Sequence, residues 1–552
     1  MTFLTLKRSL CAVLFAILVH TFPSFAFAAS PGDKGSFAPL NPEFLVFQNL
    51  RSSSVQSTFV DMNRLLGERP SPLDLSHVLS PISAGIYARS TVALPSRYDL
   101  RDHGVLLPMR DQAPFGTCWA FGALASLESS IRKAGMGDFD FSEWHLAYFA
   151  YVDESEALPA FTAYEPEFGA DPIFDQGGNN WKSTAILARW TGAVNEADRP
   201  YQHVTPWPES SKPLPSDPSS MRLKHVHHLG AEFNPQLIKQ TVMTHGSVRI
   251  RVVWTNNAYA PETSAYFNPQ KTGGGHAVNI VGWDDEYPAG NFNTDPGRDG
   301  AWIMQNSWGT EWGEKGFFYL SYADPTIGTP SIYIGGETTE FERIYQYDPL
   351  GWVESFGFGS ETAWFANIFT SAPSVSHDNA GESTVELLRA VSFYAGQANA
   401  PYTIEIRRGV DENAPTSGAL VNSTSGTLAA AGYHTVNLSS SVPLSPVERF
   451  SVVVRLTTPG YLFPVPVEMP SSGYSEKATA GAGQSFVSFD GASWSDMTTR
   501  SPNTNVCLKA FSSTGEPPSS SSGGGCIVPH GAHIYSLLLL LPLLALLGKN
   551  AR

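Results

Sequence analysis

Cys118 stands between a glycine-containing turn and a long apolar run, a position that suits a nucleophile. Within 119–131 the large apolar side chains recur at steps of two to four residues, which predicts an amphipathic helix ending near Lys133. Cys118 would lie in the first turn of that helix. Unpaired N–H groups and the positive end of the helix dipole favour a thiolate there. The alternative is a buried, unreactive cysteine, the usual state of a lone Cys.

Two later stretches place polar residues beside apolar strands. His276 opens the apolar run 277–283, and Asn306, followed by Ser-Trp-Gly, closes the run 302–305. Gln112 lies six residues before Cys118. In this order and with these neighbours, the four polar residues resemble the catalytic positions of the papain-like cysteine peptidases. The resemblance runs from about residue 94 to about residue 322.

The resemblance implies a role for each of these side chains. Cys118 would attack the peptide carbonyl and form a thioester, while His276 takes its proton and later protonates the leaving amine. Asn306 would orient the imidazole, and Trp308 would cover their hydrogen bond. The Gln112 side chain and the Cys118 backbone N–H would stabilise the oxyanion. The resemblance implies no cofactor and no metal.

Three further stretches extend the resemblance. Residues 94–101 look like the start of a mature papain-like enzyme, and Ser142 opens a stretch similar to the family's next helix start. Gly177 and Gly178 precede a predicted helix over 182–190 and resemble the turn whose backbone binds an extended substrate. The alternative for the two glycines is an ordinary tight turn.

The chain departs from the family at one paired feature. Phe115 stands where the family usually has a cysteine three residues before the nucleophile, and Asp175 stands where its disulfide partner is usual. Because both cysteines are missing together, the crosslink is lost rather than broken. We expect packing, with Phe115 as a candidate, to hold the Cys118 loop in its place, and thiol reductants not to unfold the catalytic domain.

Length and composition indicate an exported protein of several domains. A chain of 552 residues is too long for one core. Its formal net charge of −16 argues against a nucleic-acid partner, and its four cysteines do not make a disulfide scaffold.

Beyond about residue 347, short strands alternate with Gly/Ser/Asn turns, which predicts a β-sandwich. This part resembles the lectin-like domain that follows some bacterial papain-like peptidases. The predicted fold class is therefore α+β, with a two-lobed papain-like domain followed by an all-β sandwich.

The composition divides the chain into six expected parts. They are a signal peptide (1–28), a propeptide or attached N-terminal extension (29–92), the peptidase domain (93–340), the lectin-like domain (345–513), a Ser/Gly-rich linker (514–526), and a hydrophobic sorting or anchor segment with a basic end (527–552). We therefore expect export and attachment to the membrane or cell envelope through the C-terminus, with release from the cell as an alternative. Sorting and plain anchoring remain alternatives for the tail.

Two stretches offer weaker metal patterns. The run His225-Val226-His227-His228 reads more readily as a strand with exposed imidazoles than as a metal site. Residues 291–295 resemble the start of a calcium loop, but Pro296 replaces the glycine that such a loop requires. Neither is chosen as a metal site.

The function expected from the sequence is hydrolysis of peptide bonds in polypeptide substrates by an exported cysteine peptidase. Endopeptidase and exopeptidase action both remain open. A different class is a surface-displayed binding or adhesion protein with weak catalysis, acting through its β domain. The presence of all four catalytic positions favours the enzyme.

Overall fold

The structure, a computed structural model, describes residues 34–52, 66–78, 94–155, 157–163, 170–230, 234–373 and 385–516. The predicted signal peptide and the hydrophobic C-terminal segment lie outside these residues. In the described ranges, no helix is both long enough and apolar enough to cross a membrane.

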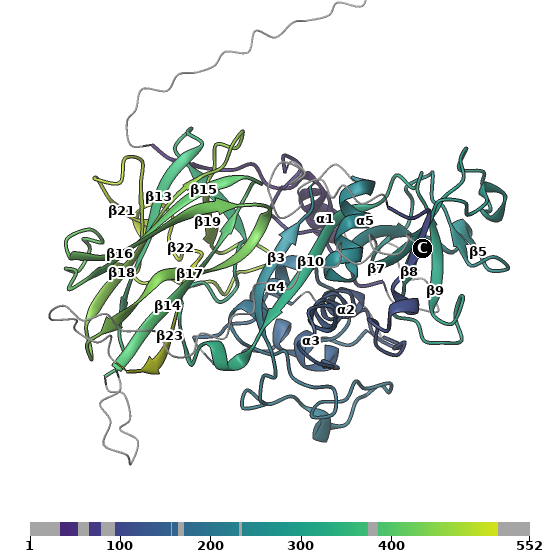
Figure 1. The fold of residues 1–552 in the computed structure, drawn as a ribbon, viewed down its shortest axis with the longest axis horizontal. Helices are drawn as coiled ribbons and strands as arrows, with labels where there is room; N and C mark the ends of the chain where they lie inside the picture. Colours follow the sequence, from purple (N-terminus) through teal and green to yellow (C-terminus); the bar gives the residue numbers. More distant parts are fainter. Residues whose placement is uncertain are drawn as a thin grey trace, which may run out of the picture.

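A group of helices occupies the middle of the molecule (Figure 1). Their starts are encoded locally: Ser142, Asn179 and Asn234 each accept a backbone N–H of the first turn that follows. The helix starts predicted at Cys118 and Ser142 are confirmed to within a residue. The helices are α1 (Pro42–Ser52), α2 (Cys118–Lys133), α3 (Glu143–Tyr151), α4 (Asn180–Ala188), α5 (Pro235–His245) and, in the β domain defined below, α6 (Met497–Arg500).

A β-rich lobe lies at the end of the molecule marked by β5, β8 and β9 in Figure 1. Its longest strand, β7, pairs with β4 on one edge and β8 on the other. Buried side chains of β4, β7 and β8 form one core with α5. The strands are β2 (Arg97–Asp99), β4 (Val248–Trp254), β5 (Tyr259–Ala260), β6 (Ala265–Tyr266), β7 (Gly274–Asp284), β8 (Ala301–Gln305) and β9 (Phe317–Ser321).

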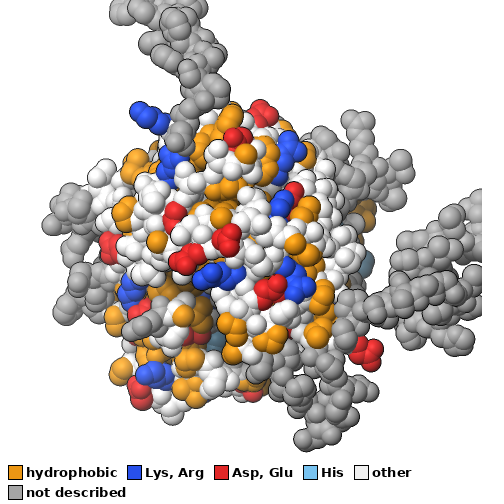
Figure 2. Space-filling view, turned by 90° about the vertical axis from the view of Figure 1, so that its left-hand side faces the viewer, with side chains coloured by type: hydrophobic (Ala, Val, Ile, Leu, Met, Phe, Trp, Pro, Cys, Tyr) orange, Lys and Arg blue, Asp and Glu red, His pale blue; other side chains and the backbone are white. Residues whose placement is uncertain are grey.

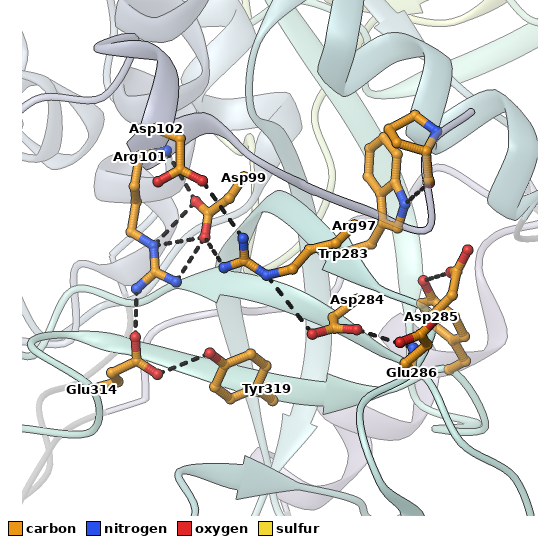
Figure 3. Close-up of polar contacts among 12 residues, drawn as sticks. Arg97, Asp99, Arg101, Asp102, Trp283, Asp284, Asp285, Glu286, Glu314 and Tyr319 are labelled. Atoms are coloured by element: carbon orange, nitrogen blue, oxygen red, sulfur yellow. Dashed lines mark hydrogen bonds and ion pairs between the residues drawn. The ribbon is translucent and has the colours of Figure 1, made fainter. Parts of the chain in front are cut away.

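Charged residues pin the short strand β2 to this lobe (Figure 3). Arg101 bonds both Asp99 and Glu314, at 2.7 and 2.9 Å. Arg97 bridges Asp99 and, across the strand pair, Asp284. The stretch that resembles a mature N-terminus is thus built into the lobe.

The sheet of this lobe continues into the second half of the chain. Among the described residues, thirteen strands share one sheet, with β3 pairing with β10 on one side and with β17 on the other. Its other members are β3 (Arg222–His228), β10 (Gly328–Gly336), β11 (Arg343–Tyr345), β14 (Val385–Ala395), β17 (Ala431–Leu444) and β23 (Leu508–Gly515). Hydrogen bonds therefore join the two halves edge to edge.

A second sheet packs on β14, β17 and β23 through a shared apolar core, which confirms the predicted sandwich. We call residues 343–515 the β domain. The second sheet contains β13 (Thr362–Thr370), β15 (Ala400–Arg408), β16 (Ala419–Leu428), β18 (Arg449–Thr457), β20 (Ser485–Ser488) and β21 (Ser495–Asp496). A smaller sheet contains β1 (Ser36–Phe37), β12 (Glu354–Gly357), β19 (Val465–Glu468) and β22 (Asn505–Val506).

The N-terminal segment, by which we mean residues 34–52 and 66–78, contacts both halves of the molecule. Its strand β1 pairs with β12 of the β domain, and Phe44 of α1 meets Tyr474 edge to face. Farther along, His77 stacks on Tyr461 with ring centroids 3.6 Å apart. Between these contacts, residues 66–69 pass along the peptidase-like lobes.

The outer end of the β domain shows no dominant charge. Figure 2 looks onto this end, where acidic and basic side chains are interspersed among hydrophobic ones. Exposed apolar side chains in this domain include Leu420, Val421 and Phe489.

Candidate active site

Cys118 is the first residue of α2 and is completely buried. Two backbone amides donate to its Sγ: Gly67 N at 3.3 Å and Ala277 N at 3.5 Å. The sulfur therefore lies at the contact of three parts of the chain: the helix start, the strand β7 and the N-terminal segment. Amides that donate to sulfur favour the thiolate, although other neighbours of Cys118 act in the opposite direction.

His276 and Asn306 are brought together by the pairing of β7 with β8. The Nε2 atom of His276 donates to Asn306 Oδ1 over 2.8 Å, which leaves Nδ1 without a hydrogen-bond partner among the described residues. Trp308 stacks on the imidazole at 4.7 Å between centroids and is 2% exposed. The tautomer and the ring orientation are thus fixed from one side, and water is excluded from the hydrogen bond.

Gln112 is held by the loop that follows Asn306. Its backbone N–H donates to Ser307 O, and its side-chain oxygen accepts the Ser307 hydroxyl at 2.7 Å. The side-chain nitrogen donates to Phe115 O at 2.9 Å. The glutamine is buried, and its amide orientation is set by two neighbours close to Cys118.

The helix with Cys118 and the strand with His276 are fastened together. Asn279 of β7 donates to Gly122 O of α2 at 3.0 Å. A Cβ atom on Gly122 would approach the Arg249 side chain to 3.2 Å, so glycine gives the helix room to lie this close to β4. The relative position of nucleophile and imidazole is therefore set by regular elements.

The place of the missing disulfide is taken by packing and a hydrogen bond. Phe115 is buried against Phe174 and Trp144, with ring centroids 5.3 and 5.7 Å away. Asp175 accepts the N–H of Gly116 at 2.9 Å. Positions 115 and 175 thus still hold the same two loops together. The two described cysteines, Cys118 and Cys507, are both free and buried.

Residues 66–69 lie in the cleft beside Cys118. Gly178 donates to Gly67 O and accepts from Arg69 N, both at 2.7 Å, so the segment forms a parallel β-bridge with the Gly-Gly turn. Glu68 N donates to Gly275 O at 3.1 Å. A Cβ on Gly177 would come within 2.6 Å of Gly67 O. Both predicted substrate-binding glycines therefore line a groove that holds an extended chain.

The pKa values of both catalytic candidates are shifted in this buried site. Burial, followed by the charge of Glu68, raises the pKa of Cys118 to about 11, although the amides of Ala277 and Gly67 oppose this rise. Burial lowers the pKa of His276 to about 4. At neutral pH the site therefore holds a thiol and a neutral imidazole while residues 66–69 are in place.

Comparison with known proteins agrees with this geometry. Residues 94–331 match the papain family of cysteine proteases, and residues 344–512 match the lectin-like domain. The chain contains a papain-family cysteine protease domain followed by a lectin-like domain. Both matches agree with the two domains that the sequence resemblance implied.

Curated relatives share the peptidase part. A cathepsin B-like cysteine proteinase 6 of Caenorhabditis elegans is 26% identical over 273 residues, which cover 44% of this chain and 66% of the relative. A cysteine protease of Blomia tropicalis is 25% identical over 241 residues, which cover 43% of this chain and 64% of the relative. The chain thus spans slightly less than two thirds of the length of these relatives.

Two solved structures match over most of this chain. The cysteine protease and lectin-like domains of Cwp84, a surface layer associated protein of Clostridium difficile, match with a TM-score of 0.68 and 23% identity over 88% of this chain and 99% of that chain. A clostridial Cwp84 variant after propeptide cleavage matches with a TM-score of 0.62 and 25% identity over 76% of this chain and 99% of that chain. The two-domain arrangement is therefore a shared fold.

Two residues of the cleft were not predicted from the sequence. Glu68 and Arg249 form an ion pair next to Cys118, with side chains 3% and 0% exposed. Arg249 was visible only as one member of an alternating strand, opposite Val248 and Ile250. The sequence signal that could have identified Arg249 is a charged residue on the face of β4 that packs against α2. Nothing in the local sequence of Glu68 marks it as a partner.

The histidine run was predicted correctly as a strand, but the prediction of exposed imidazoles is wrong. His227 and His228 are 5% and 6% exposed because His227 stacks on His434 of β17 and His228 packs on Trp181 of α4. The ligand nitrogens of His225, His227 and His434 lie within 4.8 Å of one another. Three nitrogens around one zinc lie about 3.3 Å apart, so metal binding would require these rings to close up.

The calcium-like stretch is used for other contacts. Asn293 donates its side-chain amide to Tyr259 O at 2.7 Å, and Asp295 accepts the N–H of Gly297 at 2.8 Å. These are turn and loop hydrogen bonds, and they engage the side chains that a calcium loop would need.

Proposed function

We propose that the protein is a cysteine peptidase that hydrolyses peptide bonds of polypeptides through Cys118, His276 and Asn306. The observation that supports this most directly is the orientation of His276. Its Nε2–H is bound to Asn306, while the amide of its neighbour Ala277 contacts the Cys118 sulfur. This arrangement directs the basic Nδ1 atom to the side of the ring available for proton transfer.

The reaction then follows from the groups present. His276 Nδ1 accepts the Cys118 proton, and the thiolate attacks the peptide carbonyl carbon. The Gln112 side chain and the Cys118 backbone N–H stabilise the oxyanion. The imidazolium returns the proton to the leaving amine, and a thioester remains. Water, deprotonated by the same imidazole, cleaves the thioester and releases the acid.

Substitution of the nucleophile tests this proposal. Cys118→Ala should abolish peptide hydrolysis and alkylation by iodoacetamide at that position. Cys507→Ala is the matched control, because it removes the other described buried thiol far from the cleft and should leave hydrolysis intact. Hydrolysis by a folded Cys118→Ala protein would refute the assignment. Binding without any hydrolysis by the wild type would favour the adhesion-protein alternative.

We further infer that the N-terminal extension is an inhibitory propeptide. The support is the polarity of the contact with the nucleophile. Gly67 presents its N–H to Sγ, while its carbonyl oxygen is bound by the amide of Gly178. With the carbonyl turned away from Sγ, residues 66–69 occupy the groove in an orientation that the thiol does not attack. Cwp84, which shares the fold, is described after propeptide cleavage.

Gly67 offers a way to remove the inhibition without touching the catalytic side chains. A Cβ at this position would lie 1.8 Å from Gly116 O, so Gly67→Ala should displace the segment from the cleft. We expect faster alkylation of Cys118 and immediate hydrolysis without a lag. Gly290→Ala, where a Cβ meets nothing within 4 Å, is the control. Unchanged alkylation in Gly67→Ala would contradict inhibition by this segment.

We also propose that the protein is exported and held at the cell surface by its C-terminus. This rests on the N-terminal signal pattern, the apolar tail with its basic end, and the surface-layer association of Cwp84. A chain ending at Ser522 should appear in the medium, while the full chain should fractionate with the envelope. Equal release of both forms would exclude an anchoring role for the tail.

A further inference from the structure

The buried ion pair beside the nucleophile belongs to the substrate groove. Glu68 directs its carboxylate to the Arg249 guanidinium, and both side chains are almost fully removed from solvent. Two charges buried at this depth are tolerated only when they are paired. This point of the groove is therefore built for a negative charge.

The backbone contacts around Glu68 do not select a side chain. Glu68 N donates to Gly275 O, and the atoms on either side of this residue bond Gly178. Any extended peptide has the same N–H and C=O groups, so these contacts can hold many sequences. What differs between sequences is the group that reaches Arg249.

Arg249 is fixed in place by regular structure. It belongs to β4, opposite Asn279 of β7, and its stem passes the Cβ-less Gly122 of α2. The stem of Arg249 is thus held by regular elements, which reduces the entropy cost of recognition.

A second arginine extends the positive charge along the same strand. Arg251 lies two residues farther on β4 and bonds Glu43 of α1 at 3.0 Å. Its side chain is 25% exposed, so the positive charge reaches from the buried end of the groove toward the surface. Both arginines are matched by glutamates of the N-terminal segment.

We propose that Arg249 is the residue that determines substrate specificity and that the enzyme prefers polypeptides with a glutamate or aspartate at the position that Glu68 now occupies. This inference rests on the proposed peptidase function and names its substrate class. A lysine there places two cations together in a buried site, and a neutral side chain forgoes the ion pair. The charge therefore discriminates by repulsion as well as by attraction. Arg251 adds a weaker preference for acidic residues toward the outer end of the groove.

The full-length protein gives a first test that needs no hydrolysis. Glu68→Gln and Arg249→Gln should each speed iodoacetamide alkylation of Cys118 by about tenfold or more, because the segment leaves its seat more often. The double variant should add little to either single change, since both remove the same pair. Arg249→Lys should retain part of the protection. Additive single effects, or none, would overturn the pair's role in recognition.

The second test compares substrates. We would use synthetic peptides that differ only in Glu, Gln or Lys, placed in turn at each position flanking the scissile bond. At one position kcat/KM should fall from Glu to Gln to Lys by at least about tenfold overall, and Arg249→Gln should flatten this order. Equal rates for all three residues at every position would refute the acidic preference while leaving the peptidase function intact.

A matched control separates specificity from loss of fold. Arg189 is also a buried arginine paired with a glutamate, Glu154, at 3.3 Å, but it lies away from the cleft. Arg189→Gln should lower the melting temperature without changing the Glu-to-Lys ratio. A changed ratio in this variant would overturn the assignment to Arg249. Absence of hydrolysis with all peptides, together with the expected alkylation pattern, would contradict the peptidase function. It would still support Arg249 as a binding site for an acidic side chain.

Discussion

At the scale of single residues, the catalytic candidates are positioned by neighbours that do no chemistry themselves. Ser307 orients the Gln112 amide, and Trp308 covers the bond between His276 and Asn306. Such fixed dipoles stabilise charge that develops in a transition state without reorganising at that moment. The contribution of Ser307 or Trp308 to catalysis therefore depends on the catalytic group that it positions.

Gln112 gives a quantitative prediction at this scale. Gln112→Ala should cost ~2–4 kcal/mol of transition-state stabilisation, seen as a lower kcat with little change in KM. Ser307→Ala, which only frees the amide, should have a smaller effect in the same direction. Gln202→Ala is the control, because the side chain of this partly exposed glutamine bonds only Pro200 O among the described residues. A normal kcat in Gln112→Ala would exclude an oxyanion role.

The pH dependence of Cys118 alkylation should show whether residues 66–69 lie in the cleft. Alkylation requires the thiolate, and burial together with the Glu68 charge raises the pKa of Cys118 to about 11. In the full chain the rate should therefore rise until about pH 11. In Gly67→Ala both causes are removed, so the midpoint should move to lower pH. The midpoint, unlike the rate, does not depend on access, and an unchanged midpoint would contradict this explanation.

At the scale of elements, loops that the family usually crosslinks are joined here by weaker interactions. Asp175 accepts the N–H groups of Gly116 and Asp171, at 2.9 and 2.7 Å, and Phe115 fills the space beside Phe174. These contacts position the turn before α2 without a covalent bond. Their contribution is open to direct measurement.

Asp175→Ala should destabilise the protein by about 1–3 kcal/mol, because two partly buried N–H groups lose their acceptor. Burial raises the pKa of Asp175 to about 6 from 3.8. The folded state therefore binds more protons than the unfolded state between these values, and the stability contributed by this carboxyl falls as pH rises through that window. Thermal unfolding should show a larger difference between wild type and Asp175→Ala at pH 5 than at pH 7.

At the scale of the whole molecule, the two domains share both a sheet and a core. Strand β3 pairs with β17, and one apolar cluster includes Trp181 and Val226 from one side with Trp352 and Tyr433 from the other. Removing either domain would expose this surface and an unpaired strand edge. The lectin-like domain is therefore part of the structural support of the helical lobe that carries Cys118.

Calorimetry should therefore show one cooperative unfolding transition, with equal calorimetric and van't Hoff enthalpies. Gly432→Ala should weaken the pairing of β17 with β3, because its Cβ would lie 1.9 Å from Val226 O. It should lower the transition or split it in two. Gly328→Ala, with open space around the new Cβ, should leave it unchanged. Two transitions in the wild type would show that the domains unfold independently.

The sequence by itself determined the parts of this protein that depend on local pattern. The helix at Cys118, the strands that carry His276 and precede Asn306, and the alternating strands of the β domain follow from periodicity, caps and turn residues. The sequence also showed that the disulfide usual in the family is absent, because this depends only on which residues stand at fixed distances from Cys118 and from the Gly-Gly turn. These features need no knowledge of distant contacts.

Only the tertiary structure decided what fills the groove and what lies beside it. Glu68 and Arg249 are 181 residues apart and meet because the N-terminal segment crosses the cleft. The imidazoles of His227 and His228 are buried because His434, from the other domain, packs on one of them and Trp181 on the other. A charge or a histidine has the same local pattern whether it faces water or a partner, and chain segments far apart in sequence determine which of the two it meets.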